Sequence, residues 1–253
     1  MINIKSESEI NKMRDAAKIL ADVMYAMKEN IKPGISTYEL DQIGYNVIKK
    51  AGAVAPTLGY AMPPYPAATC ISIDEQVVHG IPRKEKFLEE GQIISLDLVV
   101  GYKGWMADAA RTFPVGNISE EKQILIAAAK DCFYAGYEQA IIGNRIGDIS
   151  AAVQSVADSR NFAVIEEFVG HGIGREMHED PSVPNYKTLR KGPRIQEGMV
   201  ICIEPMIALG SKEVYLEDDG WTAVMADGKA AAHYENTIAI TSAGPEILTK
   251  MDF

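Results

Sequence analysis

A long amphipathic helix is the first element that the order of apolar and polar residues predicts. Ser6 and Glu9 have the spacing of a capping box at its start, and Pro33-Gly34 ends the helical pattern. The apolar residues between them recur at three- and four-residue steps, the spacing that places side chains on one face of an α-helix. They are Ile10, Met13, Ala17, Leu20, Met24 and Met27. We expect the methionines of this face to pack into a hydrophobic core.

A second helix and a buried hairpin follow from similar patterns. Ser36 and Glu39 repeat the capping-box spacing and begin a helix that runs to about Lys50. Further along, two apolar runs flank a turn bounded by glycines, which predicts a β-hairpin. The expected ranges are a loop over 57–69, strands over 93–100 and 105–113 with a turn over 101–104, a helix over 119–142, and strands near 163–169, 199–204 and 234–241.

A weak internal repeat relates the two halves of the chain. Gly34, Glu39 and Leu40 are matched 109 residues later by Gly143, Asp148 and Ile149, and Val47 is matched by Val156. Both sets begin a helix at the same phase, which fits a duplicated α/β unit, although so few matches also fit chance. No Gly/Ser-rich linker marks a boundary, so we expect one catalytic domain over residues 1–253.

Two aspartates in the predicted hairpin indicate a candidate metal site. With a turn over 101–104, Val100 pairs with Trp105, and Asp97 then lies directly opposite Asp108 on one face. Opposed residues have Cβ atoms about 4.5–5.5 Å apart, where like charges are destabilising, and burial raises the pKa of both carboxyls unless a cation lies between them. The alternatives are a protonated, hydrogen-bonded carboxyl pair or a shifted register that separates them.

Composition restricts the class of protein. The 253 residues are 47% hydrophobic and 24% charged, as in ordinary globular proteins, and the net charge of -10 is opposite to that of a protein that binds nucleic-acid phosphate. Cys70, Cys132 and Cys202 form no Cys-x-x-Cys pair, which argues against a zinc–thiolate site. We interpret Cys132 and Cys202 as core residues. No apolar leader or membrane-spanning run is present, so we expect a cytoplasmic protein without a membrane partner.

Three further residues extend the candidate metal site. Glu204 ends the apolar strand 199–203, and Glu235 precedes another apolar strand. His171 lies between two glycines, which let the backbone approach a ligand closely. Four carboxylates and one imidazole form a hard, oxygen-rich donor set that favours Mn, Fe(II), Co(II) or Mg over zinc. Four negative charges balance two divalent ions, as in two-metal sites.

Together these motifs resemble type I methionine aminopeptidase, a two-metal peptidase of the pita-bread fold. The match covers nearly the whole chain and is strongest at 170–175 with His178-Glu179. The resemblance implies an α/β (α+β) fold in which two duplicated halves, related by a pseudo-two-fold axis, share a curved antiparallel sheet covered by helices. The other segments that carry it are 32–37, 79–82, 110–113 beside the aspartates, 181–186, 198–199, 203–206 and 219–223.

The resemblance also implies how five residues would hold two divalent ions. Asp97 would bind one ion, and His171 and Glu204 would bind the other. Asp108 and Glu235 would bridge the two. The ions themselves are expected to be Co, Mn, Fe(II) or similar.

By the same resemblance, Glu204 would also be the general base, and His79 and His178 would contact the scissile peptide group. A pocket for the substrate methionine would be walled by Tyr60, Tyr65, Cys70, Met177 and Trp221, with His79 and His178 beside it. The sequence departs from the family pattern at this pocket. Residues 58–70 are about two residues longer than usual, Met177 replaces an aromatic residue and Asp74 replaces a common asparagine.

The expected activity is removal of the initiator methionine from nascent proteins with a small second residue. The partners would be N-terminal methionyl peptides and nascent chains, met near the ribosome, and we expect a monomer that recognises no nucleic acid. Two alternatives remain at this point. One is an X-Pro aminopeptidase or dipeptidase of the same fold, and the other is a peptide-binding relative without catalytic activity.

Overall fold

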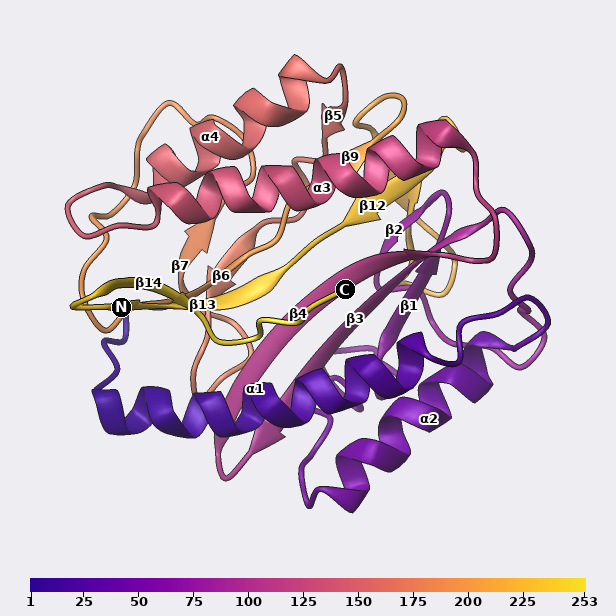
Figure 1. Ribbon diagram of the computed structural model, residues 1–253, viewed down its shortest axis with the longest axis horizontal. Coiled ribbons are helices and arrows are strands. Elements are labelled where there is room, and N and C mark those ends of the chain that lie inside the picture. Colours follow the sequence, from indigo (N-terminus) through magenta and orange to yellow (C-terminus); the bar gives the residue numbers. More distant parts are fainter.

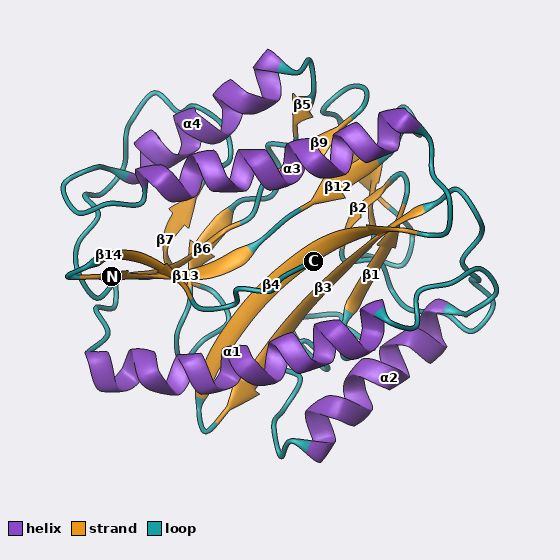
Figure 2. Cartoon of the chain, in the orientation of Figure 1, coloured by secondary structure: helices purple, strands orange, loops and turns teal.

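Helices flank a set of antiparallel strands in the computed structural model, which describes all 253 residues. In Figure 1, α1 and α2 lie along one side of the strands and α3 and α4 along the other. Figure 2 shows the same arrangement by element type, with the strands between the two helical pairs. The helices are α1 Glu7–Lys28, α2 Thr37–Lys50, α3 Glu120–Gln139 and α4 Ile146–Ser159. The strands are β1 Cys70–Ile73, β2 Gln76–Val78, β3 Ile93–Tyr102, β4 Trp105–Pro114, β5 Ala163–Val164, β6 Gly170–Gly172, β7 Glu179–Val183, β8 Val200–Ile203, β9 Met206–Ala208, β10 Val214–Leu216, β11 Ala223–Met225, β12 Ala231–His233, β13 Asn236–Thr241 and β14 Gly244–Ile247.

The two N-terminal helices form where their sequence patterns predict them. The backbone N–H of Ser6 donates to the Glu9 carboxylate at 2.9 Å, and that of Ser36 donates to Glu39 at 2.9 Å, so both capping boxes are present. All six residues of the predicted apolar face of α1 are buried. Most of them pack in one hydrophobic cluster with residues of β3 and β4, which ties α1 to the strands that carry the aspartates.

The β3–β4 hairpin has a register different from the one predicted. Tyr102 pairs with Trp105, so the turn consists of Lys103 and Gly104 alone rather than four residues. Both turn residues have positive φ, 50° and 78°, as a tight two-residue hairpin turn requires. The strands are therefore longer than expected. The predicted direct opposition of the two aspartates is wrong, because Asp97 faces Ala110 and Asp108 faces Val99.

The two aspartates nevertheless project from the same face of the hairpin. Asp97 lies two residues before Val99, the partner of Asp108, and side chains two residues apart on a strand share a face. Asp97 and Asp108 are thus diagonal neighbours, still close enough to interact. The register shift changes their separation and leaves their common direction intact.

The internal repeat reappears as two equivalent helices. Adding 109 to the ends of α2, Thr37–Lys50, gives the ends of α4, Ile146–Ser159. The residues that precede them also match, because Ser36 forms an isolated bridge with Phe87 and Arg145 forms one with Arg194. This agreement in structure supports the predicted duplication.

The strands around the site form several short sheets. The largest sheet has five strands in the order β14-β13-β8-β6-β7, and a separate sheet has the order β1-β3-β4. The strand predicted over 163–169 is mostly wrong. Only Ala163–Val164 is a strand, because the chain then leaves the sheet and places Phe168 and Val169 in the wall of a cavity. The helix predicted over 119–142 ends earlier than expected, at Gln139.

Candidate metal and peptide site

One cavity of about 240 Å³ collects the residues that the sequence singled out. Its walls come from both halves of the chain, with β3 and β4 on one side and the β6, β8 and β12–β13 region on the other. All twelve predicted site residues are among the nineteen that line it: Tyr60, Tyr65, Cys70, His79, Asp97, Asp108, His171, Met177, His178, Glu204, Trp221 and Glu235. The tertiary fold therefore gathers positions separated by up to 175 residues into one site.

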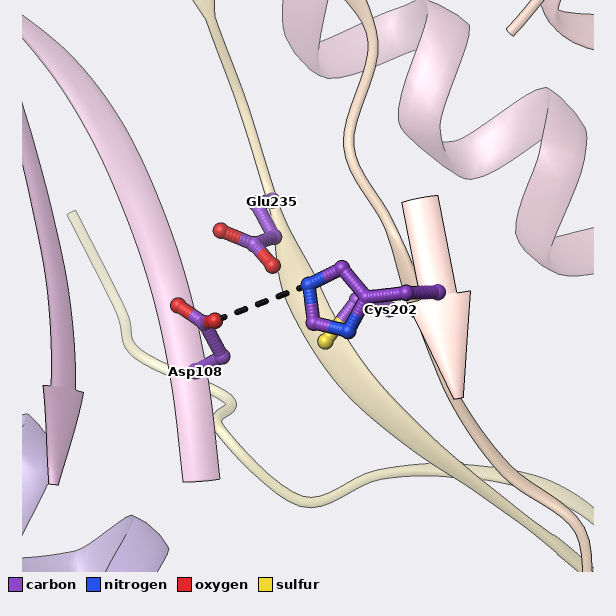
Figure 3. Close-up of side chains that lie close together, drawn as sticks. Asp108, Cys202 and Glu235 are labelled. Atoms are coloured by element: carbon purple, nitrogen blue, oxygen red, sulfur yellow. Dashed lines mark ion pairs between the residues drawn. The ribbon is translucent and has the colours of Figure 1, made fainter. Parts of the chain in front are cut away.

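Four of the five candidate metal ligands, Asp108, His171, Glu204 and Glu235, converge in this cavity, and Asp97 also lines it. The His171 Nε2 atom lies 3.8 Å from Asp108 Oδ2 and 3.5 Å from Glu204 Oε1, longer than a good hydrogen bond. Ligand atoms of Asp108, His171, Cys202 and Glu235 all lie within 4.8 Å of one another. Figure 3 shows the carboxylates of Asp108 and Glu235 turned toward the same imidazole, with the Cys202 sulfur behind it.

Buried carboxylate oxygens without partners show that this cluster fits divalent cations. Asp108 Oδ1, Glu204 Oε1 and Glu235 Oε1 are buried and accept no hydrogen bond from the protein. Burying an unpaired carboxylate is costly unless it is protonated or binds a cation. Burial, reinforced by neighbouring carboxylates, raises the pKa of Asp108, Glu204 and Glu235 well above the usual range. Burial raises the pKa of Asp97 to about 7.

The orientation of His171 is fixed by its other ring nitrogen. Nδ1 lies 2.9 Å from the backbone oxygen of Gly172. Because a carbonyl oxygen can only accept, Nδ1 carries the proton, and Nε2 presents its lone pair toward Asp108 and Glu204. Burial, with a smaller contribution from His178, lowers the pKa of His171 to about 4, so the ring is neutral. This is the tautomer in which metal-binding histidines are held by a backbone carbonyl.

Neighbouring side chains hold Asp108 and Glu235 in place through the backbone. Thr237 Oγ1 is 2.9 Å from both the backbone nitrogen and the backbone oxygen of Asp108. The guanidinium of Arg111 is buried, donates to the backbone oxygen of Glu235, and donates to Asn236 Oδ1 at 2.7 Å. Arg111 also lies over the ring of Tyr234, 4.1 Å from its centroid. Asp108 and Glu235 thus have little freedom to move apart.

Cys202 belongs to the cluster, although its sequence context indicated only a core residue. It is buried as predicted, but its sulfur lies among the ligand atoms and 3.7 Å from Thr237 Oγ1. Burial and the surrounding carboxylates raise the pKa of the thiol well above its usual value, so it is protonated. Strand alternation could have predicted that Cys202 belongs to the site. It lies two residues before Glu204 and therefore on the same face of the strand.

The chain has four histidines, and all of them line the cavity. Burial and the nearby His178 lower the pKa of His79 to about 4, and burial also lowers the pKa of His178. Both are therefore neutral at physiological pH. His233 was not predicted as a site residue. It is buried, neither ring nitrogen has a partner, and its position two residues before Glu235 was the available signal.

Aromatic side chains and a loop form the wall of the cavity. Tyr65 packs edge-on against Trp221 with ring centroids 5.2 Å apart, and its hydroxyl donates to the backbone oxygen of Gly80 at 2.8 Å. Trp221 Nε1 donates to the backbone oxygen of Pro63 at 3.1 Å, which ties the long loop to this wall. Within that loop the Tyr60 hydroxyl lies 2.8 Å from His178 Nδ1.

Comparison with known proteins explains this combination of fold and site. The model of metallopeptidase family M24 matches residues 11–242. The chain belongs to metallopeptidase family M24. Among curated proteins of the family, it is 49% identical over 249 residues to a methionine aminopeptidase of Clostridium perfringens, covering 98% of this chain and 99% of that protein. It is 44% identical to methionine aminopeptidase 1 of Bacillus subtilis, covering 99% of this chain and all of that protein.

Solved structures of M24 proteins have the same architecture. A methionine aminopeptidase of Thermotoga maritima superposes with a TM-score of 0.96 at 41% identity, covering 99% of this chain and 100% of that one. The pita-bread fold predicted from the motifs is therefore confirmed. An X-Pro aminopeptidase of the same organism shares the fold at 23% identity, with a TM-score of 0.77, and this chain covers 62% of it.

Membership in the family makes the protein a metallopeptidase, in agreement with a donor cluster suited to divalent cations. None of its helices combines the length and apolar character needed to cross a membrane.

Proposed function

We propose that this protein is a methionine aminopeptidase that removes the N-terminal methionine from peptides and nascent proteins with a small second residue. The observation that carries the proposal is a buried cluster of carboxylates and an imidazole, with unpartnered oxygens, in a cavity that also has aromatic walls. The full-length similarity to methionine aminopeptidases supports the same activity. The lower identity to X-Pro peptidases, which shows the fold alone, makes that alternative the weaker one.

We assign two divalent ions to the carboxylate cluster. Asp97 would hold one ion, His171 and Glu204 the other, and Asp108 and Glu235 both. When bound, such ions lower the pKa of water and polarise a carbonyl group. The buried oxygens without protein partners support this assignment, and a hard donor set of this kind suits Mn, Co or Fe(II).

Glu204 is suited to accept and return a proton during hydrolysis. Its Oε1 atom is buried and receives no hydrogen bond that would weaken its basicity. In the metal-free protein burial and the neighbouring Asp108 and Asp97 raise its pKa, and the assignment rests on this unpartnered oxygen, which lies 3.5 Å from His171 Nε2. We therefore assign Glu204 to remove a proton from water and to pass it toward the leaving amine.

The neutral histidines His79 and His178 are suited to bind the peptide group. An imidazole that keeps one N–H can donate a hydrogen bond to a carbonyl oxygen that gains charge in the transition state. His178 would supply this bond at the scissile carbonyl. His79, whose ring packs against Phe168 with centroids 5.4 Å apart, would contact the peptide nitrogen or the tetrahedral intermediate.

The cavity wall is chemically suited to an unbranched thioether side chain. We assign Tyr60, Tyr65, Cys70, Met177 and Trp221 to this wall. Contacts between sulfur and the edges of aromatic rings are favourable by about 0.3–1.5 kcal/mol. A methionine side chain is flexible enough to fill an irregular apolar space, whereas a β-branched side chain is not.

Peptide hydrolysis tests the proposed function directly. We expect protein loaded with Mn or Co to release methionine from Met-Ala-Ser, to leave Ala-Pro-Ala nearly intact, and to lose activity with chelator. Preference for Ala-Pro-Ala would favour an X-Pro aminopeptidase. No turnover of either peptide by metal-loaded protein would favour a binding protein without activity.

The contact between Tyr60 and His178 leads to a second prediction. If the Tyr60 hydroxyl donates to Nδ1, the His178 proton resides on Nε2, where it can be donated to substrate. Tyr60→Phe removes that donor, and we expect kcat for Met-Ala-Ser to fall about 5–10-fold, the equivalent of roughly 1 kcal/mol. Tyr215→Phe, an exposed tyrosine outside the cavity, is the matched control and is expected to match wild type. Equal kcat in all three proteins would contradict the role of Tyr60.

The biological setting is also part of the proposal. Substrates with a free N-terminal methionine arise on nascent chains, so we place the enzyme near the ribosome in the cytoplasm. The net charge of -10 offers no general attraction to nucleic-acid phosphate. We propose a monomer in which residues 1–253 act as a single catalytic domain, because both halves contribute walls to the same cavity.

A further inference from the structure

Two cavity residues lie on a segment that no β-ladder holds. Residues 174–178 connect β6 to β7 in a series of bends without helix or strand. Met177 and His178, at the end of this segment, both line the cavity. The positions of these two side chains therefore depend on whatever fixes the bends.

The carboxylate of Glu179 fixes the segment from within. Its Oε1 atom accepts hydrogen bonds from the backbone nitrogens of Arg175 at 3.0 Å and Glu176 at 3.4 Å. Its Oε2 atom accepts from Lys5 Nζ at 2.6 Å and from Asn3 Nδ2 at 3.1 Å. One oxygen thus holds the cavity segment, and the other joins it to residues at the start of the chain.

The Lys5–Glu179 pair is deeply buried and closely fitted. The two side chains are only 4% and 5% exposed. Gly174 leaves room for them, because a Cβ atom there would lie 2.7 Å from both Glu179 Oε1 and Lys5 Cε. Hydrogen bonds from Lys5 and Asn3 outweigh the effect of burial and lower the pKa of Glu179, so its carboxylate is ionised.

Lys5 is itself anchored to the part of the fold that carries Glu204. The backbone nitrogen of Lys5 donates to the oxygen of Gly198 at 2.7 Å. Gly198 directly precedes the strand region that leads through β8 to Glu204. The ion pair therefore links the backbone that leads to the proposed general base with the segment that carries His178.

We propose that Lys5 and Glu179 are positioning residues of the active site, which hold Met177 and His178 against the cavity through residues 174–178. This inference rests on the proposed function for its effect on catalysis. Without the ammonium group, the buried carboxylate loses its charge partner and draws in water, so the segment that it holds loosens.

Lys5→Met tests the proposal, because methionine keeps much of the length of the side chain and removes the charge. We expect kcat/KM for Met-Ala-Ser to fall about 10–100-fold, as small displacements of positioned groups do. KM should rise because Met177 forms the pocket, and kcat should fall because His178 acts on the peptide. In metal-free protein, amide hydrogen exchange of residues 174–178 should accelerate at least tenfold while exchange in α3 and α4 stays unchanged.

Arg14→Met is the matched control. Arg14 makes a paired contact with Glu246, at 2.9 and 2.6 Å, that joins α1 to β14 outside the cavity. Its loss is expected to lower Tm without changing kcat, KM or exchange at 174–178. If Lys5→Met also lowers Tm but leaves kcat, KM and exchange at 174–178 unchanged, the proposal is overturned. The exchange measurement needs no turnover, so it tests the pair even if wild-type protein cleaves no peptide and the proposed function fails.

Asn3→Ala provides a milder variant should Lys5→Met fail to fold. It removes one donor from the same oxygen and leaves the charge pair in place. We expect KM to rise two- to threefold and exchange at 174–178 to accelerate by a similar factor. Wild-type values of both quantities would overturn the proposal.

Discussion

Asp108→Ala is expected to abolish hydrolysis of Met-Ala-Ser while the fold survives, and Asp97→Ala to do the same. Asp108 is 4% exposed, has an unpartnered carboxylate oxygen and lies 3.8 Å from the His171 imidazole. Removing it takes away the oxygens that we assign to both ions. Several kcal/mol of transition-state stabilisation are lost with metal binding, so we expect kcat/KM to fall at least about 10³-fold.

Measuring the free energy of unfolding of the metal-free protein distinguishes a loss of activity at the site from a loss of the fold. Asp108→Ala removes a buried carboxyl that repels its neighbours, so its free energy of unfolding in chelator is expected to be close to that of wild type. Asp41→Ala is the contrasting control. The Asp41 carboxylate accepts from the backbone nitrogens of Ala68 and Thr69 and from the Thr69 hydroxyl at 2.9–3.1 Å, and unpairing such buried donors costs about 1–3 kcal/mol. Wild-type turnover in Asp108→Ala or Asp97→Ala would refute the metal-site assignment.

Chelated protein is expected to lose stability as the pH rises from about 6.5 to about 8.5. In the folded chain burial raises the pKa of Asp97 to about 7, and those of Asp108, Glu204 and Glu235 are raised well above their usual range. In the unfolded chain the same groups titrate near pH 4. The folded state therefore binds more protons than the unfolded state throughout this window. The free energy of unfolding then falls by about 1.4 kcal/mol per pH unit for each retained proton.

The histidines explain why the window begins near pH 6.5. Burial lowers the pKa of His79 and His171 to about 4 and that of His233 to about 3. As the pH falls below 6.5, the unfolded histidines bind protons and the folded ones do not. This lowers the free energy of unfolding and opposes the gain in stability that the carboxyls give as the pH falls. Above pH 6.5 the unfolded histidines lose their remaining protons, and from about pH 7.5 they are neutral in both states and only the carboxyls contribute.

Urea unfolding in chelator at several pH values measures this effect. We expect a loss of about 2–3 kcal/mol across the two-unit window for each carboxyl that stays protonated throughout it. Asp97→Asn should reduce the loss because it removes one of the titrating groups. Added Mn²⁺ should cancel or reverse it, because ionised ligands bind metal more tightly as the pH rises. A flat profile for the wild-type protein in chelator would show that the four carboxyls are not forced together.

The hairpin shows how far local patterns extend. The apolar strand and its aspartates were predictable, because a charged residue in a buried strand needs a partner. The register was predicted incorrectly, because both Gly101 and Gly104 can bound a turn. Only the folded chain shows that Lys103 and Gly104 take the left-handed conformations of a two-residue turn. The prediction that the two aspartates share a face is nevertheless correct, because the observed register differs from the predicted one by an even number of residues.

Contacts between distant segments were not predictable in the same way. The packing of strands from both halves brings the buried thiol of Cys202 into the ligand cluster and the unpartnered ring of His233 into the cavity wall. The pair of Lys5 and Glu179 joins residues 174 positions apart. Nothing in the local sequence of either residue specifies that contact, because it depends on where β6, β7 and the first residues of the chain lie together.

The sequence by itself determined the positions of the helices, the family and a set of candidate site residues that the structure brings into one cavity. It did so because helix periodicity, capping and charged residues in apolar strands are local properties, and because the family's motifs are short. Only the tertiary structure decided the hairpin register, the tautomer of His171 and the contact between Tyr60 and His178. Each of these depends on hydrogen bonds, turn geometry or burial that exist only in the folded chain and that residue patterns do not specify.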